Sequence, residues 1–146
     1  MKSERHAFIL VADEKYWKKL CERSKASNET HVFVRKNKVG PINAQRLLFY
    51  VKKPVMQIRG VADFVERLTG APEELWRDYG AESCFESFEE FCKFAQGREV
   101  MTFLRFKNFV ELENPKTAKA LKGILGSLQG FRGGYVDFET AKQLIT

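Results

Sequence analysis

Short unbroken runs of apolar and β-branched residues recur along the chain and predict buried strands. The first run, "HAFILV", ends at a polar "ADE", and "THVFVR" and "RLLFYV" have the same character. A Gly-Pro turn signal separates the second run from the third, and "KKP" follows the third. Because Pro54 cannot donate to a strand ladder, we expect a bulge or kink there. The predicted strands are 6–11, 30–35, 46–51, 55–68 and 98–113.

Other segments space their apolar residues at helical intervals and begin with residues that favour helix N-termini. Ser87 and Glu90 have the spacing of a capping box, and Phe88, Phe91 and Cys92 then share one face of the helix. The predicted helices start at Asp13, Pro72, Ser87, Asn114 and Asp137, and the first three are expected to end near Ala26, Gly80 and Gly97.

The element order is therefore β-α-β-β-β-α-α-β-α, followed by the turn "LQGFRGGYV", a short strand and a closing helix. We find no internal repeat, low-complexity tract or linker, so residues 1–146 are predicted to form a single domain. Several long strands with local helices predict an α+β fold built around a small mixed barrel. In the turn, Gly133 and Gly134 are expected to permit positive φ or a close approach of two backbones.

The charge of the chain is unevenly distributed. Its 146 residues include 25 Lys and Arg against 19 Asp and Glu, a formal net charge of +6. The net charge is +9 over residues 1–60, −5 over 61–98 and +2 over 99–146. Apolar residues make up 44% of the chain and include 13 Phe, which is enough for a core and argues against disorder. The basic first part favours a polyanionic partner, usually nucleic acid.

Motifs of the common catalytic and cofactor sites do not occur in the sequence. There is no P-loop, dinucleotide fingerprint, HExxH or nucleophile elbow. Three Cys without C-x-x-C spacing and two His give no zinc pattern, so we expect neither metal nor cofactor. We expect reduced thiols in a cytoplasmic protein, with Cys21 and Cys92 in the core. His31 is interpreted as structural, and no stretch is long enough to cross a membrane.

Basic residues lie beside aromatic residues at several predicted strand ends. Lys and Arg at such positions neutralise phosphates, and exposed Tyr or Phe stack on unpaired bases. A solvated surface on which Lys protects strand edges would give the same pattern. We predict phosphate contacts from Arg35, Lys36, Lys38, Lys52, Lys53, Arg105 and Lys107, and base contacts from Tyr50, Arg132 and Tyr135.

Residues 30–112 resemble the PUA-like superfamily, and in particular its ASCH and EVE-type branch. The similarity is carried by "FYVKKP", "RGVADF", "APEELW" with a following "YG", and "FEEF". Within that branch the whole chain is most similar to a largely archaeal ASCH-like family of uncharacterised proteins. The resemblance implies a pseudo-barrel of mixed strands with short flanking helices. It also implies a cleft between barrel and helices that binds RNA or a modified base, as in relatives.

The resemblance leaves catalysis open, because some ASCH relatives are ribonucleases or amidohydrolases that act on modified nucleosides. The Lys-Thr pair of the amidohydrolase-type turn is not matched, since the nearest turn here, "RKNKVG", has no Thr. We therefore predict an RNA-binding module, with a hydrolase acting on a modified nucleoside, a nucleotide or RNA as the alternative. A third interpretation gives the acidic helices over 72–96 a protein partner. Arg132 and Tyr135 are expected to form the cleft wall opposite the "RKNK" loop.

Overall fold

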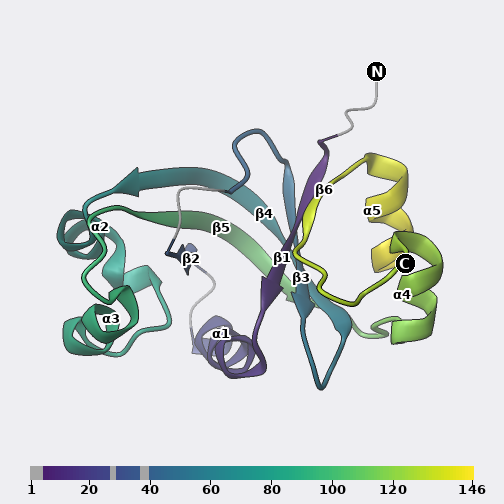
Figure 1. The fold of residues 1–146 in the computed structure, drawn as a ribbon, viewed down its shortest axis with the longest axis horizontal. Coiled ribbons are helices and arrows are strands. Elements are labelled where there is room, and N and C mark those ends of the chain that lie inside the picture. Colours follow the sequence, from purple (N-terminus) through teal and green to yellow (C-terminus); the bar gives the residue numbers. More distant parts are fainter. Residues whose placement is uncertain (1–4, 27–28, 37–39) are drawn as a thin grey trace.

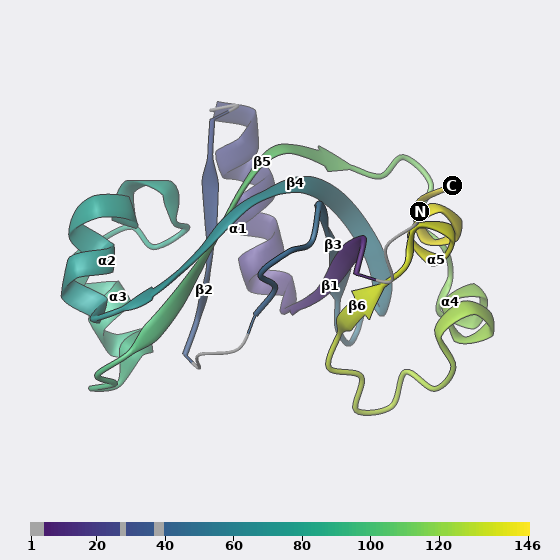
Figure 2. The same cartoon turned by 90° about the horizontal axis from the view of Figure 1, so that it is seen from above.

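A six-stranded sheet forms the centre of the protein in a computed structural model that describes residues 5–26, 29–36 and 40–146. The strand order is β2-β5-β4-β3-β1-β6, with β1 and β3 parallel and the other neighbours antiparallel. The sheet curls into a half-barrel, and the arching of β4 and β5 is visible in Figure 2. The strands are β1 (Ala7–Ala12), β2 (His31–Arg35), β3 (Arg46–Val51), β4 (Gln57–Gly70), β5 (Met101–Glu111) and β6 (Gly134–Val136).

Five α-helices and one 3₁₀ helix connect these strands within the described ranges. The first helix, α1 (Glu14–Ala26), joins β1 to β2 and lies beside the middle of the sheet (Figures 1 and 2). One pair of helices lies at one end of the molecule and a second pair at the other (Figure 1). These are α2 (Pro72–Tyr79) and α3 (Phe88–Ala95), with η1 (Gly80–Glu82) between them, and α4 (Ala118–Leu125) and α5 (Phe138–Ile145). The predicted element order and α+β class are confirmed.

Local capping explains where most helices begin. Asp13 Oδ1 accepts from the Tyr16 backbone N–H at 2.7 Å, and the Ser87 and Asp137 side chains cap α3 and α5, as predicted. The predicted cap of α4 was wrong. Thr117, and not Asn114, is its N-cap, because the Thr117 hydroxyl accepts from the N–H three residues later at 3.1 Å. The helix therefore starts one turn later than the sequence pattern suggested.

The "KKP" segment is the turn of the antiparallel hairpin between β3 and β4. The Lys53–Pro54 peptide bond is cis, and Pro54 lies outside both strands. The irregularity expected at Pro54 lies elsewhere, since the register shifts between Phe49 and Tyr50 of β3, where Arg59 of β4 has no paired residue. The hairpin thus carries its bulge inside β4 rather than at the proline.

The core consists of three apolar clusters around the sheet. One lies between the curled sheet and α1, and includes Trp17, Phe49 and Phe106. The second lies against α4 and α5, and the third joins α2 and α3 to β5 through Phe91 and Phe103. Gly60 makes room for the first cluster, because a Cβ there would come within 2.5 Å of the Trp17 ring. Phe residues thus fill the core, as the composition suggested.

The two cysteines predicted to lie in the core differ in their burial. Cys21 is buried in the cluster beneath α1, whereas Cys92 on α3 is exposed, so its predicted place in the core was wrong. The buried face of α3 follows Phe91 and Ala95, which are four residues apart, and Cys92 lies about 100° around the helix from Phe91. Within the described residues, none of the helices is long and apolar enough to span a membrane.

The glycine-rich turn before β6 brings two backbones into close contact. Gly133 has a φ of 81°, and a Cβ there would lie 2.1 Å from the carbonyl oxygen of Ile9 in β1. No side chain fits at that distance, so the turn requires glycine for space as well as for backbone conformation. The predicted role of Gly133 is confirmed, and this contact places β6 against β1.

Candidate functional site

The half-barrel does not close between β1 and β2. Within the described strands, β2 pairs only with β5, and β6 covers β1 only over Ala7–Ile9. A cavity of ≈ 330 Å³ lies at this opening, lined by the end of β1, the start of α1, β2, Lys52 of the β3–β4 turn, and the segment Cys84–Phe94 around α3. This volume lies near the lower limit of ligand pockets, which span about 300–1,000 Å³.

Aromatic side chains form much of the cavity wall. Tyr16 and Phe33 meet edge to face at 4.9 Å on one side, and Phe85 and Phe94 lie 5.2 Å apart on the other. All four residues are partly exposed and line the cavity, so part of each is accessible from it. Such rings offer stacking faces for a planar ligand such as a nucleobase.

The free edge of β2 adds backbone hydrogen-bonding groups to this wall. Residues of an antiparallel strand direct their N–H and C=O alternately toward and away from the paired strand. The Val32 carbonyl accepts a long hydrogen bond of 3.4 Å from Tyr16 Oη, so Val32 faces away from β5. Val34, two residues on, has the same orientation and also lines the cavity. Its N–H and C=O are therefore directed toward the space where a ligand would lie.

Lysines from separate elements surround the cavity. Lys15 and Lys19 come from α1 and Lys52 from the β3–β4 turn, while Asp13 and Glu90 contribute the acidic groups. Asp13 is engaged at the α1 N-terminus. The rim therefore carries more positive than negative charge, which suits an anionic ligand.

Lys19 and Glu90 form an ion pair of 3.0 Å across the cavity. This hydrogen bond raises the pKa of Lys19 and lowers that of Glu90. The second Glu90 carboxylate oxygen accepts from the Glu86 backbone N–H at 3.2 Å. Both groups are thus held in their charged forms, and both oxygens of Glu90 are occupied.

Cys84 and Tyr16 are the remaining titratable groups in the wall with altered pKa values. Burial raises the pKa of the Cys84 thiol to about 11, and burial, followed by the neighbouring Cys84, raises the pKa of Tyr16 well above 10.0. At neutral pH both keep their protons. Cys84 is therefore not an activated nucleophile, which would need a lowered thiol pKa.

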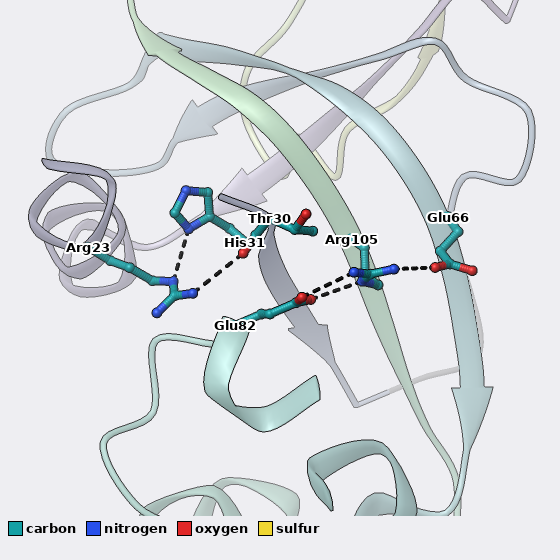
Figure 3. Close-up of polar contacts among 6 residues, drawn as sticks. All are labelled: Arg23, Thr30, His31, Glu66, Glu82 and Arg105. Carbon is teal, nitrogen blue, oxygen red and sulfur yellow. Dashed lines mark hydrogen bonds and ion pairs between the residues drawn. The ribbon is translucent and has the colours of Figure 1, made fainter. Parts of the chain in front are cut away.

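Two separate polar groups hold neighbouring elements together: one joins α1 to β2, and the other joins the α2–α3 segment to β5 and β4 (Figure 3). Arg23 Nε donates to His31 Nδ1 at 2.9 Å, and Arg105 makes two hydrogen bonds to Glu82, at 2.9 and 3.1 Å, and a third to Glu66. These ion pairs raise the pKa of the Arg105 guanidinium. These contacts speak against the predicted phosphate contact at Arg105, because three of its five guanidinium N–H groups are already used within the protein.

Some of the other residues predicted to bind nucleic acid lie at the cavity, and others lie away from it. Lys52 lines the cavity, and Lys36 reaches its rim, with Nζ 4.7 Å from the centre of the Phe94 ring and 3.2 Å from Gln96 Oε1. Tyr50 is only 3% exposed and packs against Phe131, so the prediction that it stacks on a base was wrong. Its burial follows from facing the α4–α5 cluster.

The remaining predicted residues lie outside the cavity wall. The Tyr135 hydroxyl accepts from the Ile42 backbone N–H at 3.0 Å, so it contacts the loop before β3, and neither Tyr135 nor Arg132 lines the cavity. The cleft wall that they were expected to form opposite the "RKNK" loop stays a prediction. Lys38 lies outside the described residues. Arg35 lies beside Val34 without lining the cavity, and Lys53, Lys107 and Arg132 are exposed elsewhere.

Sequence reasoning missed Lys15, Tyr16, Lys19, Phe33 and Phe94 as cavity residues. The apolar face of α1 includes Tyr16, which the pattern assigned to the core, and the lysines beside it were assigned to a solvated face. An aromatic residue flanked by Lys at adjacent helical positions was the signal that could have identified this wall. Within the described residues, no group of His, Cys, Asp and Glu is arranged to hold a metal ion.

Comparison with known proteins places this geometry in a family and a fold. The family model described as "Domain of unknown function (DUF365)" matches residues 15–128. The crystal structure of ASCH from Zymomonas mobilis is similar, with a TM-score of 0.77 and 21% identity, over 97% of this chain and 94% of that chain. A variant of that protein with a serine replaced by alanine has a TM-score of 0.76 and 21% identity, over 97% of this chain and 96% of that chain. A variant with a tyrosine replaced by phenylalanine has a TM-score of 0.78 and 20% identity, over 97% of each chain. No curated protein matches the sequence. The predicted PUA-like, ASCH-type fold is confirmed.

Proposed function

This chain belongs to the DUF365 family and has the fold of ASCH-domain proteins, and from this premise we propose that it is an RNA-binding module that takes one unpaired base, plain or modified, into the cavity between β1 and β2. The RNA backbone would follow the lysines at the rim. Cysteines 21, 84 and 92 are all free, which agrees with a role in the cytoplasm, where thiols stay reduced.

The observation that supports this proposal most strongly is the make-up of the cavity. Four partly exposed aromatic rings, a free strand edge and a basic rim occur together at one opening. Proteins that bind single-stranded RNA use these three components for stacking, for hydrogen bonding to base edges, and for neutralising phosphates. The shape of a single cavity suits one base rather than a duplex.

Binding agrees with the charges of the cavity better than catalysis does. A general acid or base works best with a pKa near the operating pH. The Lys19–Glu90 pair has its two pKa values moved apart, away from neutrality, and Cys84 is protonated. A hydrolase that used one of these three groups as acid, base or nucleophile would have to change its protonation state during the reaction. We therefore propose recognition of RNA rather than its cleavage.

The test is binding of single-stranded RNA by fluorescence anisotropy across a salt series. Phe94→Ala removes a stacking face, and we expect affinity to fall by about 5- to 150-fold, the effect of losing about 1–3 kcal/mol of stacking. Lys52→Ala should reduce the slope of log K against log[salt] by about 0.7, the value for one phosphate contact on a single strand. Lys52→Ala leaves the core clusters intact, whereas Phe94 also packs against the cluster of α2, α3 and β5, so the Tm of Phe94→Ala is measured beside its affinity.

The matched control is Lys122→Ala, which removes the same charge from α4 at the far end of the molecule (Figure 1). It should leave RNA affinity unchanged. Binding that is equally strong in Phe94→Ala, or absent from the wild type at low salt, would contradict the proposal. Turnover of a panel of modified nucleosides by the wild type would instead establish the hydrolase alternative. A protein partner at α2 and α3 would be shown by a pull-down that charge reversal of Glu73 abolishes while RNA binding stays intact.

A further inference from the structure

Strand register places two arginines and two threonines together on the inner face of the sheet. Arg35 of β2 is opposite Thr102 of β5, which is opposite Thr69 of β4. Paired residues of neighbouring strands project from the same face, so these three side chains form one row. In the next row, Arg67 is opposite Leu104 on the same face. This group lies at the end of β2 beyond Phe33, and none of its members lines the cavity.

The Arg35 guanidinium is incompletely satisfied. Its Nη1 atom is buried and has no hydrogen-bond partner, the only such side-chain nitrogen or oxygen in the described part of the chain. Arginine stays protonated at any physiological pH, although burial lowers the pKa of this side chain. A buried polar atom without a partner is costly, and native proteins rarely leave one without a functional reason.

Negative charge does not compensate for Arg35 in its surroundings. Among the described residues, no carboxylate lies within ion-pair distance of Arg35 or of its neighbour Lys36. The sequence contains no Asp or Glu between Glu29 and Asp63, a stretch with seven Lys and Arg. The surroundings of Arg35 therefore favour an anion from outside the chain.

Hydroxyl and guanidinium donors surround the same position. Thr69 Oγ1 and Thr102 Oγ1 lie 3.3 Å apart, so one hydroxyl can donate to the other while the second donates outward. Thr69 is exposed and Arg35 partly so, which leaves the site open to solvent. Arg67 Nη1 donates to the Gly40 carbonyl at 3.3 Å, which fixes the guanidinium end of the side chain from the neighbouring row.

We propose that Arg35, with Thr69 and Arg67, binds a phosphate group on the inner face of the sheet. The fork of the Arg35 guanidinium matches two phosphate oxygens, and the Thr69 hydroxyl a third. This site goes beyond the proposed RNA binding, because it does not require a base in the cavity. The phosphate group comes either from the RNA backbone or from a free phosphorylated molecule, and the experiment separates these sources.

The first measurement is thermal unfolding in inorganic phosphate and in chloride at matched ionic strength. We expect saturating phosphate to raise the wild-type Tm by about 3 °C or more. Arg35→Met keeps the length of the side chain and removes its charge, and should raise the apparent phosphate Kd by at least about tenfold. Its Tm in chloride should equal or exceed that of the wild type, because an unpaired buried charge has been removed.

The control and the second variant separate a site from a general charge effect. Arg77→Met removes an equal charge from an exposed residue of α2 and should keep the full phosphate response. Thr69→Val removes only a hydroxyl and should weaken phosphate binding without unfolding the protein. A wild type that responds equally to phosphate and chloride, or an Arg35→Met variant with an unchanged phosphate response, would overturn the proposal. So would a large fall in the Tm of Arg35→Met in chloride, which would make Arg35 a structural residue.

RNA binding by Arg35→Met identifies the source of the phosphate. If RNA supplies it, affinity for single-stranded RNA and its salt dependence fall together with the phosphate response. If a free phosphorylated molecule supplies it, RNA affinity is unchanged while the phosphate response is lost. Phe94 is not among the proposed phosphate ligands, so Phe94→Ala keeps its phosphate response in both cases, and failure of the RNA proposal is distinguishable from failure of this one.

Discussion

The imidazole of His31 is almost completely buried and accepts a hydrogen bond from Arg23 through Nδ1. Burial, followed by the adjacent Arg23 charge, lowers the pKa of His31, while the carboxylate of Glu82 acts weakly in the opposite direction. The Phe106 ring lies 5.6 Å away on the β5 side. His31 is therefore held neutral in the folded protein, and the structural role predicted for it agrees with this environment.

We expect the protein to lose stability in mild acid because of His31. The unfolded chain protonates this group near its ordinary pKa of 6.5, and the folded chain only at lower pH. The contribution of neutral His31 to the free energy of unfolding is complete above pH 6.5. It is lost as the pH falls below 6.5, by at most about 1.4 kcal/mol per pH unit. Urea unfolding of the wild type and His31→Gln between pH 7.5 and 5 measures this, and an equally steep loss in His31→Gln would assign it to another group.

Gly133 shows that a single missing Cβ controls the attachment of the last strand. For Gly133→Ala we expect a loss of more than about 3 kcal/mol in the free energy of unfolding. The new methyl group would clash with the Ile9 carbonyl, and alanine disfavours the positive φ at this position. Gly130→Ala is the matched control, since Gly130 has a φ of 68° and open space around it. It should lose only about 1–2 kcal/mol. Equal losses in urea unfolding would mean that backbone conformation alone matters.

At the scale of elements, the segment from α2 to α3 is docked onto the sheet through Arg105. This side chain extends from β5, bonds Glu82 of η1 and Glu66 of β4, and lies 4.8 Å from the centre of the Tyr79 ring. The same segment supplies Phe85, Glu90 and Phe94 to the cavity. Arg105 therefore holds in place a segment that forms one wall of the cavity, without lining the cavity itself.

Removing Glu82 should loosen this segment. For Glu82→Ala we expect a loss of about 1.5–3 kcal/mol in the free energy of unfolding, since two hydrogen bonds to a partly buried guanidinium disappear. Amide hydrogen exchange should accelerate over residues 80–95, which become less firmly attached. Glu89→Ala is the control, because Glu89 is 83% exposed and pairs with Lys93 at 3.8 Å. It should change stability by less than about 0.5 kcal/mol. A Glu82→Ala effect as small as the control's would contradict the docking role.

Elements were predictable from sequence because strand runs and caps are local signals. Strand β3 coincides with the prediction, and Asp13 and Ser87 cap the expected helices. The errors arose where a distant partner decides the outcome. Tyr50 became a core residue through α4 and α5, and Arg105 was paired with a carboxylate more than 20 residues before it. Periodicity along the chain gives no information on either partner.

On the scale of the whole molecule, the basic first part and the acidic middle part meet at the cavity. Residues 1–60 supply Lys15, Lys19 and Lys52 to its rim, and Glu90 comes from the acidic segment. The uneven charge therefore identified the part of the sequence that supplies the lysines at the rim. It did not separate cavity lysines from solvated ones, because that depends on where α1 crosses the opening of the half-barrel.

The open edges of β1 and β2 also bear on how the protein stays in solution. An unpaired strand edge is a template for pairing with the edge of another copy, which leads to aggregation. Here α1 and residues around α3 line the cavity beside the β2 edge, and Lys15 and Lys19 of α1 would repel a second copy of this basic chain that approaches it. The lysines proposed to attract a ligand would thus also disfavour pairing of the β2 edge with another copy. Damage to α3 would then be expected to show first as self-association, before the fold itself is lost.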